Sequence, residues 1–353
     1  MSFASAAMVL LAPGLTASAK APWYERPSCA QAVQSVMELK VEDSKAQIEK
    51  LERSRDPDDI ACSVYARVNL AEMYLTLYGD TPKWVQYRLD QLQRMYGFSR
   101  AFGKYGRRFK DMEIEARMRR IRALFEKGEK TSAISEARTT DRMLDRRRQG
   151  PVSPTVDFVT GVLYTTLGDA PFYQRALLQM AGIGGDADIG HAALNRLAHG
   201  DTVYAIEATY ISHHFATTAH KEGERSDFGK PWDTGRRLTQ LAENPQYAVE
   251  YTRALRKVKR CADALPVLQP HLDVLAQDRS HWSSEMRAKL YFEASRCAVE
   301  TGALDLADEM RNRLVAQNRP KFQKDLDQLS AKIEAARQAA SVTPASRVVG
   351  DEG

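Results

Sequence analysis

The sequence has 353 residues, of which 43% are hydrophobic and 27% are charged. This length allows one large buried core or an extended array of smaller cores, and the composition is that of an ordinary soluble globular protein. The formal net charge of +5, from 51 basic and 46 acidic residues, is too small on this chain to indicate nucleic-acid binding by itself.

The first segment of the chain has the pattern of an export signal. Residues 3–15 are uncharged and mostly apolar, but they are too few to span a bilayer, which takes about 20 apolar residues. Ala17-Ser18-Ala19 follows as an A-x-A cleavage pattern, so residues 1–19 are predicted to be a secretory signal peptide cut after Ala19. No Lys or Arg precedes Lys20, and a disordered apolar N-terminus of a cytosolic protein is the alternative.

From Ala30 onward almost every segment has helical periodicity, and strand-like alternation is scarce. Gly, Pro, Asp and Asn mark the turns between the segments, and Ser153-Pro154 is a typical helix start. The sequence therefore predicts an all-α protein. Its expected helices cover residues 28–39, 43–53, 58–78, 82–96, 109–127, 133–147, 154–167, 171–181, 187–199, 202–221, 231–242, 246–260, 262–277, 281–301, 304–316 and 321–340. Residues 341–353 are expected to be a disordered tail.

One layout recurs along the chain. Gly302 ends a helix, and the small residue Ala307 follows five positions later, where two helices would cross closely. Gly128 and Ala133 repeat this spacing. Weaker copies are the segment 261–265 and the pairing of Ala46 with Pro57.

These residues resemble the tetratricopeptide-repeat superfamily over residues 27–340. The resemblance implies a right-handed α-solenoid of stacked helical hairpins with a concave groove. The middle, residues 161–275, departs from the plain repeat through the turn Gly182–Gly190. It is similar to exported bacterial repeat proteins, including the T-component of TRAP transporters, and to the eukaryotic tetratricopeptide 39 group.

Four cysteines remain after the predicted signal peptide, an even number in a chain whose predicted export would place it in an oxidising compartment. Cys29 and Cys62 are 33 residues apart in the sequence, about one repeat, and both lie near the start of a first helix. Cys261 opens one helix, and Cys297 lies near the end of the next. We predict the disulfides Cys29–Cys62 and Cys261–Cys297, with four buried free thiols as the alternative. No Cys spacing is typical of a zinc site.

Two patterns could carry chemistry but fit structural interpretations better. Residues 182–187 match a loose G-x-G-x-x-A dinucleotide motif, which needs a preceding strand that is not predicted here. A glycine turn with Asp186 capping the next helix is the preferred interpretation. All seven histidines lie between residues 191 and 281. His213 and His220 share a helix face beside His214 and could ligate a metal, although a polar helix face explains them without one. No catalytic, cofactor or metal site is predicted.

Residues 100–148 carry 16 Lys or Arg against 8 Asp or Glu. Arg138, Arg142 and Arg146 share one face of a predicted helix. This face is a candidate docking surface for an acidic partner, an anionic envelope polymer, a membrane surface or, in a cytosolic protein, RNA. A solvated face balanced by Glu136, Asp141 and Asp145 is the alternative.

The sequence predicts a periplasmic or secreted, non-catalytic scaffold that binds another cell-envelope protein as a peptide or helix in its concave groove. Nucleic acid is not an expected partner, and peripheral contact with the membrane is left open. Two other functions are retained. A small-ligand carrier associated with a transporter would need a closed apolar pocket, and an enzyme would need at least two His residues converging with a carboxylate in the His-rich hairpins.

Overall fold

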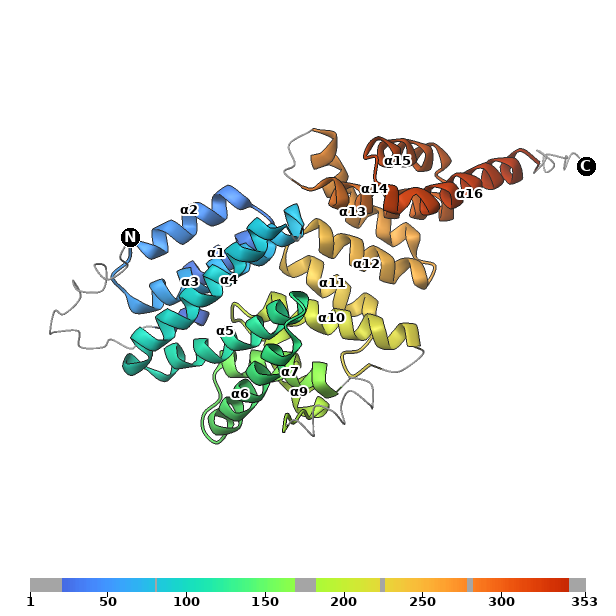
Figure 1. Ribbon diagram of the computed structural model, residues 1–353. Helices are drawn as coiled ribbons and strands as arrows, with labels where there is room; N and C mark the ends of the chain where they lie inside the picture. The colour runs from blue at the N-terminus through green and yellow to red at the C-terminus, as the bar shows by residue number, and fades with distance from the viewer. Residues whose placement is uncertain (1–20, 80, 169–181, 223–225, 278–281, 343–353) are drawn as a thin grey trace, which may run out of the picture.

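The computed structural model describes residues 21–79, 81–168, 182–222, 226–277 and 282–342. Within these ranges the regular structure is entirely helical (Figure 1), so the predicted all-α class is confirmed. The predicted signal peptide, the expected helix 171–181 and the tail from residue 343 lie outside the described residues.

The first part of the chain forms long helices joined by short turns. A 3-10 helix η1 (Trp23–Glu25) precedes α1 (Pro27–Met37), α2 (Val41–Glu52), α3 (Pro57–Tyr78), α4 (Pro82–Phe102), η2 (Gly103–Tyr105), α5 (Arg107–Glu126), α6 (Lys130–Arg148), α7 (Pro154–Gly168), α9 (Ala187–Ala198) and α10 (Ala205–Glu222). The second part comprises α11 (Pro231–Leu241), α12 (Pro245–Lys257), α13 (Cys261–Ala276), α14 (Ser284–Glu300), α15 (Leu304–Ala316), η3 (Pro320–Phe322) and α16 (Gln323–Val342).

The helix boundaries follow the local signals in the sequence. The Ser153 side chain accepts a hydrogen bond from the Val156 backbone N–H at 3.3 Å, which caps α7 where the Ser-Pro pair predicted a start. Asn244 caps α12 in the same way, through Gln246. Gly128 and Gly302 have φ angles of 79° and 78°, the left-handed conformation that glycine adopts readily after a helix.

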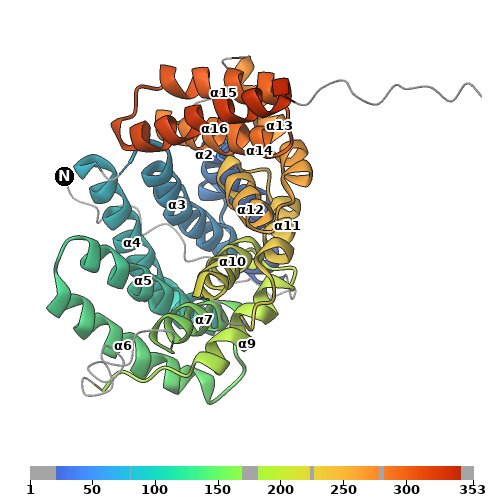
Figure 2. The same ribbon diagram turned by 90° about the vertical axis from the view of Figure 1, so that its right-hand side faces the viewer.

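Consecutive helices lie against one another, and the array bends until distant parts of the chain meet. Figure 2 shows the helices following an arc in which the blue N-terminal helices lie near the yellow helices α10–α12. The Val203 backbone N–H donates to the Tyr24 carbonyl at 3.1 Å, and the Tyr247 hydroxyl donates to the Met37 sulfur at 3.7 Å. The start of the chain is therefore held against residues that follow it by about half the chain length.

The buried apolar side chains divide the molecule into two regions. One continuous core extends from Trp23 to Phe228, and we call residues 21–228 the N-terminal region. Smaller separate clusters lie between Leu238 and Ile333, and we call residues 231–342 the C-terminal region. None of the helices described is long and apolar enough to cross a membrane.

Candidate functional site

Both predicted cysteine pairs lie at disulfide distance. Cys29 of α1 and Cys62 of α3 have Cα atoms 5.6 Å apart, and both side chains are fully buried. Cys261 of α13 and Cys297 of α14 have Cα atoms 4.8 Å apart. Disulfides persist in oxidising compartments, so the two pairs favour an extracytoplasmic environment.

The interior of the N-terminal region contains aromatic rings that come from widely separated elements. Trp23, Tyr65, Phe158 and Tyr204 are each at most 1% exposed. The ring centroids of Tyr65 and Tyr204 are 5.2 Å apart, and those of Phe158 and Tyr204 are 4.9 Å apart. These elements would have to separate before a partner could enter between them.

A buried ionic network lies beside the rings. The Arg119 guanidinium is 2.9 Å from the Glu115 carboxylate and 2.7 Å from that of Glu207. The Tyr204 hydroxyl donates to Glu115 at 2.7 Å, and Tyr65 donates to Glu207 at 3.3 Å. One guanidinium thus links two carboxylates of α5 and α10 in the protein interior.

Burial and charge pairing shift the pKa values of this network in opposite directions. Burial raises the pKa of Glu115, although Arg119 acts in the opposite direction. Burial also disfavours charge on Arg119, but Glu207 and Glu115 outweigh it and hold the arginine pKa above its ordinary value. Because each charged group depends on the others, the network holds α5 against α10.

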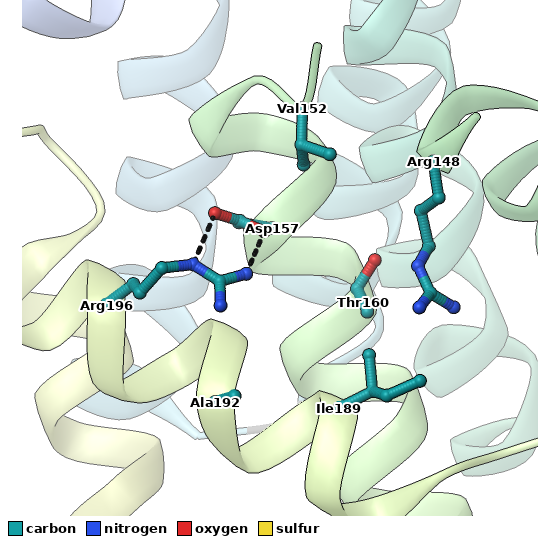
Figure 3. A pocket seen from close by; sticks show the side chains of 7 residues that line it. All are labelled: Arg148, Val152, Asp157, Thr160, Ile189, Ala192 and Arg196. Atoms are coloured by element: carbon teal, nitrogen blue, oxygen red, sulfur yellow. Dashed lines mark hydrogen bonds and ion pairs between the residues drawn. The ribbon is translucent and has the colours of Figure 1, made fainter. Parts of the chain in front are cut away.

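A depression of ≈ 310 Å³ lies at the surface of the same region, between α7, α9 and the end of α6 (Figure 3). Its lining residues are Arg148, Val152, Asp157, Thr160, Ile189, Ala192 and Arg196. Arg196 extends from α9 to Asp157 of α7 at 2.7 Å, and Figure 3 shows Arg148 on the opposite side of the depression. Ile189, Ala192 and Val152 add apolar surface, so the depression combines an apolar lining with two guanidinium groups, of which that of Arg196 is paired with Asp157.

Close packing of α7 on α9 sets the shape of this depression. Gly190 allows the helices to touch, because a Cβ atom there would lie 2.5 Å from the Thr165 backbone nitrogen. At Gly168, a Cβ atom would lie 2.5 Å from that of Ala187. The Gly182–Gly190 turn is also fixed in place. The Gly184 backbone N–H donates to Asp141 at 3.1 Å, and Asp186 caps α9 as predicted.

The predicted basic face lies on α6, the helix that ends at Arg148. Arg142 and Arg146 are exposed, whereas Arg138 is half-buried. In the described part of the chain, neither Arg142 nor Arg146 forms an ion pair.

The acidic residues that were expected to balance this face have other partners. Glu136 pairs with Arg117 at 3.1 Å, and the buried Asp141 accepts from Gly184. Asp145 accepts from the Tyr164 hydroxyl at 3.4 Å. Two exposed arginines of α6 therefore remain available for an anionic partner.

The three histidines highlighted in the sequence have different surroundings. His213 is buried rather than on a polar face, and its ring lies 3.0 Å from the Thr234 hydroxyl. Burial lowers the pKa of His213 to about 4. The exposed His220 lies against the Trp232 ring at 5.8 Å, and His214 is also exposed. The metal alternative built on these three residues gains no support from their positions.

Sequence reasoning did not identify the depression. Asp157 and Arg196 are 39 residues apart in the chain, and nothing in their local patterns marks them as neighbours. Only Arg148 belonged to the basic segment already noted. No protein-family model matches the chain, and no curated protein matches it in sequence.

Proposed function

We propose that this protein is a non-catalytic scaffold of the cell envelope that binds an acidic segment of a partner protein. In this proposal the helical hairpins form a right-handed tetratricopeptide-like solenoid, and the chain is periplasmic or secreted after removal of residues 1–19. The observation that carries the proposal is the depression between α7 and α9, with an apolar lining and a guanidinium group on either side.

The chemistry of the depression selects the kind of partner. An apolar side chain of the bound segment would contact Val152, Ile189 and Ala192, and carboxylates beside it would face Arg148 and Arg196. Arginine forms bidentate contacts with carboxylates and is favoured at the centres of interfaces. Arg142 and Arg146 of α6 are also exposed, and their charge would speed the encounter with an acidic partner at long range.

The binding site in this proposal differs from the concave groove expected from the sequence. In the N-terminal region the aromatic rings and the Glu115–Arg119–Glu207 network fill the space between the helices. A partner that bound there would have to displace buried charges and rings, whereas the depression between α7 and α9 is already open to the surface. Docking in the depression therefore breaks no buried contact and costs less free energy.

Two matched valines provide the test. Val152 lines the depression and is 44% exposed, and Val315 of α15 is 56% exposed and far from it in sequence. The purified wild-type protein, the variant V152D/A192D and the control V315D would each be crosslinked in native envelope extracts, and the bound segments mapped by mass spectrometry. Wild type and V315D should recover the same acidic segment, with less recovered at higher salt. V152D/A192D should lose it.

Three outcomes would contradict the proposal. Recovery of no specific protein by the wild type would argue against a scaffold. Equal recovery by V152D/A192D would remove the depression as the site. A bound segment without acidic residues would remove the charge argument.

A further inference from the structure

A separate cluster of metal-binding side chains lies where the turn 226–229 meets α9. Asp188, His191 and Asp227 each present one oxygen or nitrogen atom, and the three atoms all lie within 4.8 Å of one another. The His191 Nδ1 atom is 2.8 Å from an Asp227 carboxylate oxygen. One imidazole and two carboxylates are ligands that zinc and similar divalent ions accept in proteins.

Local structure brings two of these residues to one face. Asp188 and His191 are three positions apart on α9, so their side chains project from the same side of the helix. Asp186 accepts from the backbone N–H groups of Asp188 and Ile189, at 3.0 and 3.3 Å. This cap fixes the first turn of α9, and with it the position of Asp188 relative to His191.

The third residue is held by packing rather than by helix geometry. Phe228 is 7% exposed, and its ring lies 4.7 Å from that of His191 and 6.1 Å from that of Phe215. The Ser226 hydroxyl accepts from the Phe228 backbone N–H at 3.2 Å, which tightens the turn. Because Phe228 anchors the turn, the neighbouring Asp227 is brought to the imidazole.

The charges at this position suit a divalent cation. With a neutral imidazole, Asp188 and Asp227 give the cluster two negative charges at close range, which repel each other. In the described ranges, neither carboxylate has a Lys or Arg partner within ion-pair distance. A divalent ion would neutralise both, and tetrahedral coordination needs ligand atoms about 3.3 Å apart. The two aspartates are exposed, so small side-chain rotations can supply this spacing.

We propose that Asp188, His191 and Asp227 form a binding site for a zinc-like divalent metal ion. The ion would use three protein ligands and leave at least one coordination position open to solvent or to a ligand. It would also join α9 to the turn 226–229, two segments that are 36 residues apart in sequence. This proposal does not require that the depression between α7 and α9 is a docking surface.

The test is a zinc titration of untagged, chelator-treated protein with its disulfides intact, measured by competition with a chromophoric chelator. Cobalt binding followed by visible absorption gives a spectroscopic readout of the same site. His199 directly follows α9 as its C-cap, is exposed, and has its Nδ1 2.8 Å from the Asn195 carbonyl oxygen of that helix, so H199A is the matched control. H191A and D227N should each weaken zinc binding at least tenfold, and H199A should bind as the wild type does.

Hydrogen exchange gives a second readout that does not depend on the affinity. Zinc should slow amide exchange at the start of α9 and in residues 226–229 of the wild type, but not of D188N. Thermal unfolding of the metal-free variants would confirm that each is folded. Wild-type zinc affinity in H191A, an equal loss in H199A, or the same exchange response in D188N would each overturn the proposal.

Discussion

The N-terminal and C-terminal regions are both built from helices, but different kinds of contact hold the helices together. In the N-terminal region one core joins residues as distant as Trp23 and Tyr204, and a buried ionic network links α5 to α10. Within the C-terminal region the contacts join neighbouring helices, such as Arg253 with Glu293 and Cys261 with Cys297. A stack of neighbours can lose stability one hairpin at a time, whereas a region closed by long-range contacts should unfold as a unit.

The largest expected effect comes from removing the arginine of the buried network. Arg119→Ala leaves Glu115 and Glu207 facing each other without a cation, which should lower the free energy of unfolding by about 3–5 kcal/mol. The matched change in the C-terminal region is Arg253→Ala. There Glu293 keeps Arg256 at 3.5 Å, and Arg253 is 34% exposed, so a loss of about 1 kcal/mol is expected. Urea unfolding of both variants measures the difference, and equal losses would contradict it.

Removal of either cysteine pair should destabilise the protein, but the extent of the chain that opens should differ between the two variants. Replacing both members of either pair by alanine frees a chain segment of more than thirty residues, which should cost about 3–4 kcal/mol. Hydrogen exchange should show faster opening across the whole N-terminal region in C29A/C62A. In C261A/C297A, only α13 and α14 should open faster. Uniform opening in both variants would mean that the two regions do not differ in cooperativity.

Two glycine-to-alanine substitutions compare a glycine at a close helix contact, Gly190, with a glycine in a turn, Gly302. Gly190→Ala places a methyl group against the Thr165 backbone and should cost about 2–3 kcal/mol by overpacking. Gly302→Ala has open space around the new methyl group, but its φ of 78° is unfavourable for alanine, so about 1 kcal/mol is expected. Thermal melts that rank the two variants in the reverse order would contradict the close approach of α7 and α9.

The last comparison concerns pH, and its effect should be similar in the two regions. Burial lowers the pKa of His213 and of His271 to about 4, below the ordinary value of 6.5. The unfolded chain therefore binds protons that the folded chain does not. Stability is fully present above pH 6.5 and is lost progressively as the pH falls toward 4. Each histidine should contribute a loss of about 1.4 kcal/mol between pH 7.5 and 5.5.

Unfolding titrations at the two pH values would measure this loss in the wild type, H213Q and H271Q. Each variant should show a smaller pH-dependent loss than the wild type, by about the amount assigned to one histidine. An unchanged pH dependence in H213Q would mean that His213 is not buried in its neutral form.

Local signals in the sequence predicted the helices among the described residues, although α4 extends six residues beyond the predicted end at Tyr96. Gly128, Gly302, Ser153-Pro154 and Asn244-Pro245 mark boundaries that the structure reproduces within a few residues. The cysteine pairs followed from spacing and from the expectation that neighbouring helices pack together. Both kinds of prediction depend on residues close in the chain, where propensity and periodicity carry information.

The long-range contacts could not be predicted in this way. Glu115 and Arg119 are four residues apart, the spacing of an ordinary surface ion pair on a helix, yet Glu115 is fully buried. Nothing in the sequence around Asp227 indicates that it lies beside His191, because that contact depends on how Phe228 packs. The bend of the array, which brings Trp23 to Tyr204, is set by many small packing choices.

Photo-crosslinking in native envelopes tests most directly whether the depression between α7 and α9 receives the partner. A photoreactive amino acid would replace exposed Ala192 in one protein and exposed Val315 in another, and the crosslinked peptides would be sequenced. The proposal predicts that position 192 crosslinks to one acidic protein segment and position 315 does not. Crosslinks to the same protein from position 315 alone would contradict it.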